Sequence, residues 1–186
     1  MRCAGHDPRM EMRAELMINA PAEDAWVVVG ERFGDIGEWA SAITESVMDG
    51  PPAVGQVRSC QIAGFGPIKA GVITERLIQF DPAARSLTYQ AAGGMPWFIA
   101  GAVSHWSVAA RPGGACTVRI HATLALRPAA RPLSPVLRWR LRAGTRRTLA
   151  EFRRRVEAGH PDQASPGTPA SRNTPPLGAT KAPERG

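Results

Sequence analysis

Cysteine, lysine and tyrosine are scarce in this 186-residue chain, and long apolar runs are absent. Cys3, Cys60 and Cys116 lie far apart and form neither a CxxC pair nor a metal-ligand spacing. We expect reduced thiols, as in a cytoplasmic protein. No run approaches the roughly 20 apolar residues of a membrane helix. The N-terminus has no apolar core of a secretory signal, so we expect none.

Sequence motifs for several common chemistries are also missing. There is no GxSxG nucleophile elbow, no phosphate loop and no dinucleotide fingerprint, so we expect no cofactor. Ser104 and His105 are neighbours on a predicted strand and point to opposite faces, which excludes a nucleophile–base pair. His105 and His121 have no third ligand at a suitable spacing, so we expect no metal site.

Arginine carries almost all of the positive charge. Lys69 and Lys181 are the only lysines, and the net charge is +7. Such a balance permits contact with an anionic membrane surface or with nucleic acid. No recognition-helix or base-stacking motif accompanies the arginines, so we expect no specific nucleic acid partner. Peripheral contact with an anionic membrane stays open.

The composition divides the chain into three parts. Residues 1–9 are expected to form a flexible leader. Residues 160–186 are rich in Pro, Gly, Ser, Thr and Ala and offer little to bury, which predicts a disordered tail. Residues 10–159 are long enough for one domain, as a monomer or a homodimer.

Within this domain the pattern predicts an α+β fold. A strand at 10–19 is followed by two short helices at 21–30 and 31–40. A long helix is expected at 133–158. Turn residues delimit six further strands, at 43–49, 54–63, 68–80, 85–92, 98–110 and 115–127. Short connections require successive strands to run antiparallel, which gives a seven-stranded antiparallel sheet with the long helix covering one face.

The long helix has one apolar stripe at three- and four-residue steps. The stripe consists of Leu133, Leu137, Leu141, Gly144/Thr145, Thr148/Leu149, Phe152 and Val156. Gly144 is a weak helix former near the middle of this stripe. A residue this small either leaves room between helix and sheet or marks a kink or packing defect, and the sequence does not separate these alternatives.

Several strings resemble the START/Bet v 1-like superfamily, also called the SRPBCC or polyketide cyclase/dehydrase and lipid transport group. "INAPAEDAW" resembles its entry into the first helix, and "TERLIQFDPAARSLTY" resembles its most recognisable hairpin. "GGMPWFIAG" is similar to its following loop and strand. The resemblance covers about residues 10–158 and implies a helix-grip fold, a curved seven-stranded sheet around the C-terminal helix.

The resemblance also implies a cavity and its walls. The Glu of the hairpin string, Glu75, and the aromatic residue of the return strand, Tyr89, would face this cavity. Trp97 would be a lid or rim residue, in one of two loops, 63–67 and 93–97, that would flank the mouth. The full set of expected ligand-binding residues is Cys60, Ile62, Ile73, Glu75, Leu77, Tyr89, Trp97, His105, His121 and Gly144.

Two of these assignments have an open alternative. From the residues alone, Glu75 is equally a solvated or ion-paired carboxylate. Alternation in 115–127 places the apolar set on even positions, so His121 points outward, whereas the resemblance allows it inside. His105 on the neighbouring predicted strand carries the same ambiguity.

Three functions remain. The first is binding of a hydrophobic or aromatic small molecule, lipid or polyketide-like, between sheet and helix. The second is a polyketide cyclase/dehydratase with Glu75 as acid/base. The third is a basic interaction module that docks on anionic lipid or nucleic acid. The sequence leaves open whether the protein is an enzyme.

Overall fold

The computed structural model of this chain describes residues 9–64 and 70–159. The expected leader, apart from Arg9, and the expected tail, 160–186, lie outside the described residues. The strands are β1 (Arg9–Ile18), β2 (Ile43–Met48), β3 (Val57–Ile62), β4 (Gly71–Asp81), β5 (Ser86–Gly93), β6 (Ile99–Arg111) and β7 (Ala115–Leu126). The helical elements are α1 (Ala22–Trp26), η1 (Val27–Glu31), η2 (Phe33–Glu38), η3 (Pro128–Leu133) and α2 (Ser134–Ala158).

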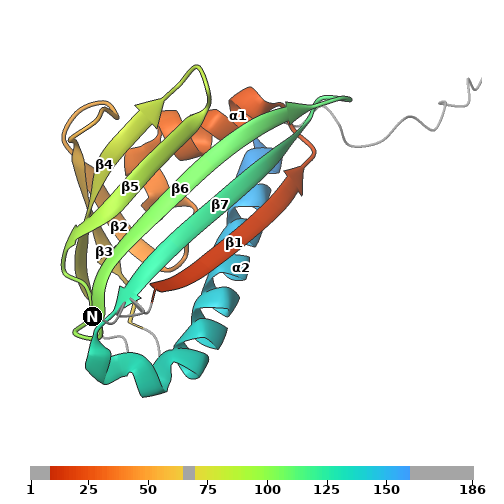
Figure 1. The fold of residues 1–186 in the computed structure, drawn as a ribbon. Helices are drawn as coiled ribbons and strands as arrows, with labels where there is room; N and C mark the ends of the chain where they lie inside the picture. Colours follow the sequence, from red (N-terminus) through yellow and green to blue (C-terminus); the bar gives the residue numbers. More distant parts are fainter. Residues whose placement is uncertain (1–8, 65–69, 160–186) are drawn as a thin grey trace, which may run out of the picture.

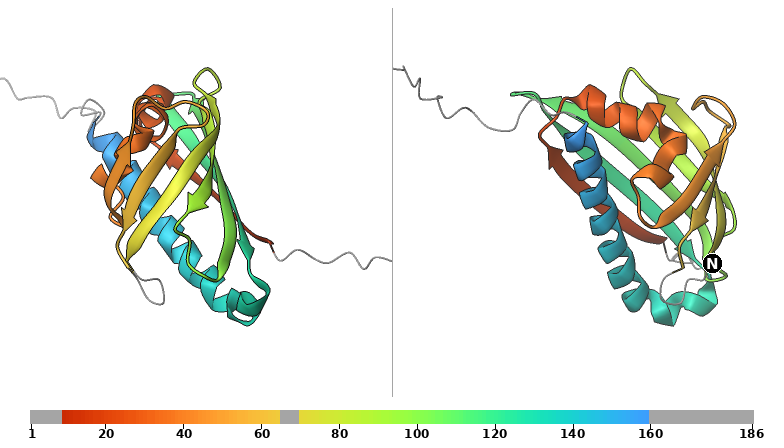
Figure 2. Two further views of the ribbon diagram at one scale, coloured as in Figure 1. Left: turned by 90° about the vertical axis from the view of Figure 1, so that its left-hand side faces the viewer. Right: turned by 180° about the vertical axis from the view of Figure 1, so that it is seen from behind.

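The strands form one curved antiparallel sheet in the order β1-β7-β6-β5-β4-β3-β2 (Figure 1). The predicted fold class and helix-grip architecture are confirmed. β2 to β7 follow one another as antiparallel neighbours, and β1 closes the order by pairing with β7. α2 runs beside β1 along the inner face of the sheet (Figure 2). Among the described helices, none is long and apolar enough to cross a membrane.

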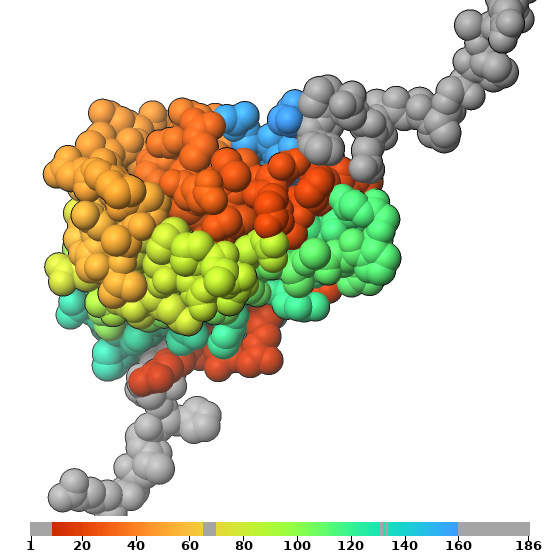
Figure 3. Space-filling view, turned by 90° about the horizontal axis from the view of Figure 1, so that it is seen from above, coloured from red at the N-terminus to blue at the C-terminus, as the bar shows by residue number. Residues whose placement is uncertain are grey.

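Local sequence chemistry sets the turns between strands. Gly113 and Gly114 have φ of 81° and 73°, a region that favours glycine, and they join β6 to β7. In the β4–β5 turn, the backbone N–H of Ala84 donates to the Asp81 carboxylate at 2.9 Å. These two turns lie near α1, which covers the same end of the sheet (Figure 3).

The short helical segment is more irregular than the sequence predicted. α1 ends at Trp26 and continues as a π-helical turn, and the second predicted helix is 3₁₀. The indole of Trp26 lies over Gly30, where an added Cβ would be 2.5 Å from the ring atoms Cε2 and Cζ2. Such close packing requires that residue 30 has no side chain beyond its hydrogen.

Two hydrophobic clusters fill the space between sheet and helices. The larger cluster lies against α1 and the second half of α2, and includes Trp26, Trp106 and Phe152. The smaller one lies near the start of α2, and includes Met10, Phe98 and Leu137. The core is therefore divided along α2.

Between these clusters the apolar stripe of α2 is open to solvent. Leu137 at one end is buried, and so are Leu149, Phe152 and Val156 at the other. In the middle, Thr145 is partly exposed and Gly144 is exposed, with no atom within 4 Å of the position that a Cβ would occupy. The expectation that Gly144 lies in a buried stripe is wrong at this point, although α2 is continuous there.

The second half of α2 is held to the rest of the fold by Glu151. The carboxylate accepts hydrogen bonds from the Ser41 backbone N–H at 3.0 Å and from its hydroxyl at 2.5 Å. Arg147 donates to the same carboxylate at 3.1 Å. Burial opposes ionisation of Glu151, but the hydrogen bonds from Ser41 and Arg147 outweigh it and lower its pKa.

Candidate functional site

A buried ion pair lies on the inner face of the sheet, next to Phe33 and Tyr89. Arg58 on β3 and Glu75 on β4 are direct partners in the strand register. Nε and Nη2 of Arg58 lie 2.7 and 2.6 Å from Oε2 of Glu75. The side chain of Arg58 is 3% exposed and that of Glu75 is 14% exposed. Glu75 is thus both ion-paired and interior, which unites two readings that the sequence left as alternatives.

Aromatic rings and a carbonyl enclose the guanidinium. Nη1 of Arg58 donates to the backbone carbonyl of Phe33 at 2.6 Å. The guanidinium carbon lies 3.7 Å from the centroid of the Phe33 ring and 5.0 Å from that of Tyr89. Burial by itself lowers the pKa of Arg58, but the charge of Glu75 opposes this and the net pKa is raised. Arg58 is therefore a permanent cation that holds Glu75 in place.

One oxygen of Glu75 remains available. The hydrogen bonds from Arg58 go to Oε2, as does a 4.0 Å contact from the Cys60 thiol. No described residue donates a hydrogen bond to Oε1. Burial raises the pKa of Cys60, so this residue stays a neutral thiol and not a nucleophile. The arrangement thus presents a fixed acceptor atom, Oε1, to the interior.

Tyr89 contributes a neutral hydroxyl on the next strand. Burial raises the pKa of this phenol, the charge of Glu75 raises it further, and Arg58 offsets part of the effect. A small cavity of about 10 Å³ lies between Tyr89, Arg58, Phe33 and Trp39, among others. This volume suits about one water molecule. The indole N–H of Trp39 is buried and has no acceptor among the described residues.

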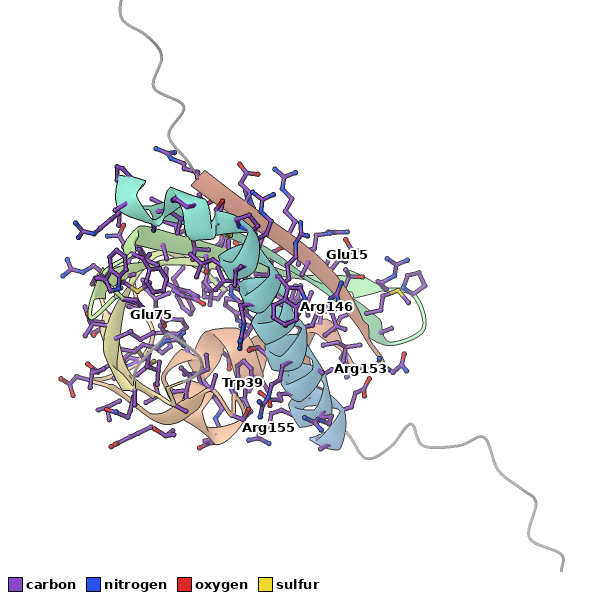
Figure 4. The ribbon with its side chains drawn as sticks, turned by 90° about the horizontal axis from the view of Figure 1, so that it is seen from below. Glu15, Trp39, Glu75, Arg146, Arg153 and Arg155 are labelled. Carbon is purple, nitrogen blue, oxygen red and sulfur yellow. The ribbon has the colours of Figure 1, made fainter. Side chains whose placement is uncertain are left out.

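The other β-strand residues that were expected to line the cavity differ in how deeply they are buried. Leu77 pairs with Tyr89 in the register and is fully buried. Ile73 pairs with Cys60 and is partly exposed, as is Ile62. The structure thus brings Cys60, Glu75 and Tyr89 together, flanked by apolar side chains. Figure 4 looks at this region from below, with Glu75 on the sheet side and α2 across from it.

The two histidines lie on the outer face of the sheet and do not line the interior. His105 and His121 are direct partners in the β6–β7 register, out of phase with the buried Trp106 and Ile120. Nδ1 of His105 is 2.9 Å from the hydroxyl of Thr88, and Nε2 of His121 is 3.6 Å from a carboxylate oxygen of Glu11. Their placement in an interior site was wrong, and the alternation of the strand gave the right direction for His121.

Trp97 lies in the connection between β5 and β6. Its side chain is 66% exposed, and its ring meets the buried Phe98 edge to face at 5.8 Å. The other loop expected at the mouth, 63–67, lies partly outside the described residues. A rim role for Trp97 remains a prediction.

Sequence analysis missed Arg58. The signal was present, because Arg58 has the same strand parity as Cys60, which was assigned to the interior. An isolated arginine is almost never fully buried, so its residue type gives no indication of an interior position. In the structure the carboxylate of Glu75 on β4 balances the charge of Arg58, which allows this arginine to be buried.

Comparison with known protein families identifies the family of this chain. The model of the family described as polyketide cyclase / dehydrase and lipid transport matches residues 9–157. The chain belongs to this family. None of the curated proteins searched matches it.

Solved structures share the fold at low sequence identity. Ara h 8.0201 has a TM-score of 0.65 at 13% identity, covering 81% of this chain and 99% of that one. The ZhuI aromatase/cyclase from Streptomyces has a TM-score of 0.64 at 17% identity, covering 82% and 98%. The di-domain aromatase/cyclase StfQ of the steffimycin pathway has a TM-score of 0.67 at 16% identity, covering 82% and 52%. At these identities the likeness establishes the fold alone.

Proposed function

We propose that this member of the polyketide cyclase/dehydrase and lipid transport family binds a hydrophobic small molecule that carries a hydroxyl group. The ligand lies between the sheet and the middle of α2. The observation that carries the proposal is the largely buried carboxylate of Glu75, whose Oε1 accepts no hydrogen bond from a described residue. The middle of α2 around Gly144 is also unpacked.

The chemistry of the walls supports this ligand class. Apolar and partly exposed side chains such as Ile62 and Ile73 gain by covering apolar ligand surface. The carboxylate of Glu75 accepts a hydrogen bond and donates none, so it favours a ligand hydroxyl. Because Arg58 fixes this carboxylate, little conformational entropy is lost when a ligand binds.

Paired ligands test the proposal. Thermal-shift and fluorescence titrations would compare 2-naphthol with naphthalene, which lacks the hydroxyl. We expect 2-naphthol to bind at least tenfold more tightly, since a hydrogen bond to a charged acceptor contributes about 1.5–3 kcal/mol. Glu75→Gln should remove most of this preference, whereas Glu15→Gln, an exposed carboxylate paired with Arg119, should not.

A second variant covers the case that Glu75→Gln fails to fold. Gly144→Leu places a side chain into the open stretch without touching the ion pair, and should weaken both ligands. The proposal is wrong if no member of a hydrophobic ligand panel stabilises the wild-type protein, or if Gly144→Leu binds both naphthyl compounds as the wild type does.

The alternative is a polyketide cyclase/dehydratase, supported by the family and by the interior carboxylate oxygen of Glu75. Glu75 would act as acid/base on a reactive poly-β-ketone chain. Against it, Glu75 is the counterion of the buried Arg58, and a proton on Glu75 would leave that cation unbalanced. Glu75→Gln should abolish turnover of such a chain while sparing its binding. Surviving turnover would exclude this role.

A further inference from the structure

The positive charge of the chain is concentrated in one segment. Residues 127–150 include η3 and the first part of α2, and they contain seven arginines and no acidic residue. This surplus equals the net charge of the whole protein, +7, so the rest of the chain has as many basic as acidic residues. We call residues 127–150 the basic segment. η3 and the start of α2 form the lower end of the molecule in Figure 1.

The arginines at the start of α2 are not neutralised by neighbouring acids. Arg138, Arg140 and Arg142 are exposed, and no described acid forms an ion pair with any of them. Arg147 differs, because it pairs with Glu151 just beyond the segment. The start of α2 therefore presents uncompensated positive charge to solvent.

Apolar side chains lie between these arginines on the solvent side of α2. Val136, Trp139 and Ala143 follow one another at three- and four-residue steps, so they share one face of the helix. Val136 is 60% exposed and Trp139 is 66% exposed, and Ala143 is also exposed. Helical geometry places Arg142 on one side of this line and Arg140 on the other. The guanidinium carbon of Arg140 lies 5.5 Å from the centroid of the Trp139 ring.

The opposite face of the basic segment is packed against the sheet. Ala130 and Leu137 are buried in the smaller hydrophobic cluster together with Phe98. The backbone N–H of Arg127 donates to the carbonyl of Phe98 at 3.0 Å, which places the adjacent, exposed Trp97 at the same end of the molecule. The core contacts therefore fix the orientation of the segment and leave its apolar line facing outward.

We propose that the outer face of the basic segment docks on an anionic lipid bilayer. The negative surface potential of such a membrane attracts the arginines. Val136 and Trp139 enter the boundary between headgroups and hydrocarbon, where indole rings are favoured. The first part of α2 then lies along the membrane plane. This inference goes beyond the interior ligand site, because neither Glu75 nor the unpacked stretch at Gly144 takes part in the contact.

Two other partners fit this surface less well. A second copy of the chain would bring two surfaces of like charge together, which costs free energy. Nucleic acid would satisfy the arginines through its phosphates, but a contact made mainly with phosphates offers nothing to an aliphatic side chain such as Val136. A bilayer interface accommodates the basic and the apolar side chains together.

Vesicle co-sedimentation of the full chain tests the charge contribution. At low salt the protein should bind phosphatidylcholine vesicles that contain phosphatidylglycerol, and it should not bind phosphatidylcholine alone. The triple variant Arg138→Gln/Arg140→Gln/Arg142→Gln should bind roughly a hundredfold more weakly, because each arginine near an anionic surface contributes about fivefold. The matched control Arg76→Gln/Arg111→Gln/Arg154→Gln removes the same charge from exposed positions outside the basic segment and should bind nearly as the wild type does.

Fluorescence quenching tests the apolar contribution. Phosphatidylglycerol-containing vesicles with brominated acyl chains should quench the tryptophan fluorescence of the bound wild-type protein. Trp139→Phe should lose much of this quenching. Trp39→Phe, which removes an indole packed edge to face against Phe152, should keep it.

Three results would overturn the proposal. The first is no binding to phosphatidylglycerol vesicles at low salt. The second is an equal loss of binding in both triple variants while both remain folded by circular dichroism, because net charge alone would then explain it. The third is binding without any quenching that depends on Trp139. Tighter binding to duplex DNA than to vesicles, lost in the Arg138→Gln/Arg140→Gln/Arg142→Gln variant, would also contradict the proposal and make the surface a nucleic acid site.

Discussion

Arg58 and Glu75 lie directly opposite each other on β3 and β4 and form an ion pair in which two guanidinium nitrogens share one carboxylate oxygen. The other carboxylate oxygen accepts no hydrogen bond from a described residue. A buried cation thus holds and orients the candidate ligand anchor.

Removing Arg58 should strongly destabilise the fold. Arg58→Met leaves Glu75 as an uncompensated charge of low exposure, which costs about 3–5 kcal/mol of unfolding free energy. Urea denaturation measures this. Arg119→Met is the matched control, because Arg119 pairs with Glu15 at 2.9 Å on an exposed surface and should change stability by no more than about 1 kcal/mol. Equal losses would contradict a buried role for the pair.

Glu151→Gln should make the free energy of unfolding depend less on pH in the acid range. The pKa of Glu151 is lower in the folded protein than its ordinary value of 4.5, so the unfolded chain takes up the proton first as the pH falls. Glu151 therefore stabilises the protein above the unfolded pKa, and this contribution is lost as the pH falls through the folded pKa.

Urea denaturation from pH 7 to pH 3 measures this effect. At neutral pH Glu151→Gln should be less stable by about 1–3 kcal/mol, and the difference should shrink towards pH 3. Glu157→Gln, which affects the more exposed contacts with Arg153 and with the backbone N–H of Asn19, serves as the control. Parallel profiles for wild type and Glu151→Gln would contradict the assignment.

Tyr89 is the only tyrosine of the chain, so its ionisation can be followed by itself in the ultraviolet. Because its pKa is raised above 10, phenolate absorbance should appear later than for a free tyrosine. The unfolded chain loses this proton first as the pH rises, so stability falls from about pH 10 through the folded pKa. Titration in 6 M guanidinium provides the unperturbed reference. Coincident native and denatured titrations would show that Tyr89 is not buried beside Glu75.

Two glycine substitutions should act in opposite directions. Gly30→Ala places a methyl group 2.5 Å from the Trp26 indole and should cost about 1–3 kcal/mol. Gly144→Ala meets open space within a helix and should add about 0.5–1 kcal/mol. Thermal unfolding of both variants measures the difference. A destabilising Gly144→Ala would mean that the middle of α2 is packed.

Strand alternation and turn residues predicted the order and most boundaries of the elements. The strand predicted at 54–63 begins three residues before the observed start of β3 at Val57. Residues 53–56 form a turn, and Gly55 is the only glycine or proline in it, so there was little indication of this turn in the sequence. The π-helical turn after Trp26, where the indole packs over Gly30, was also missed. Such packing has no periodic pattern in the sequence.

The sequence by itself determined that one amphipathic helix covers an antiparallel sheet. Apolar side chains repeat every two residues in a strand and about every 3.6 residues in a helix, and both repeats are local properties of the chain. The interior position of Glu75 was expected only from the resemblance to a known superfamily. Only the tertiary structure decided that Arg58 is the partner of Glu75, that the histidines are outside, and that α2 leaves its middle open. Each of these depends on the register between strands and on where a curved sheet departs from a straight helix, and both are set by contacts between residues far apart in the chain.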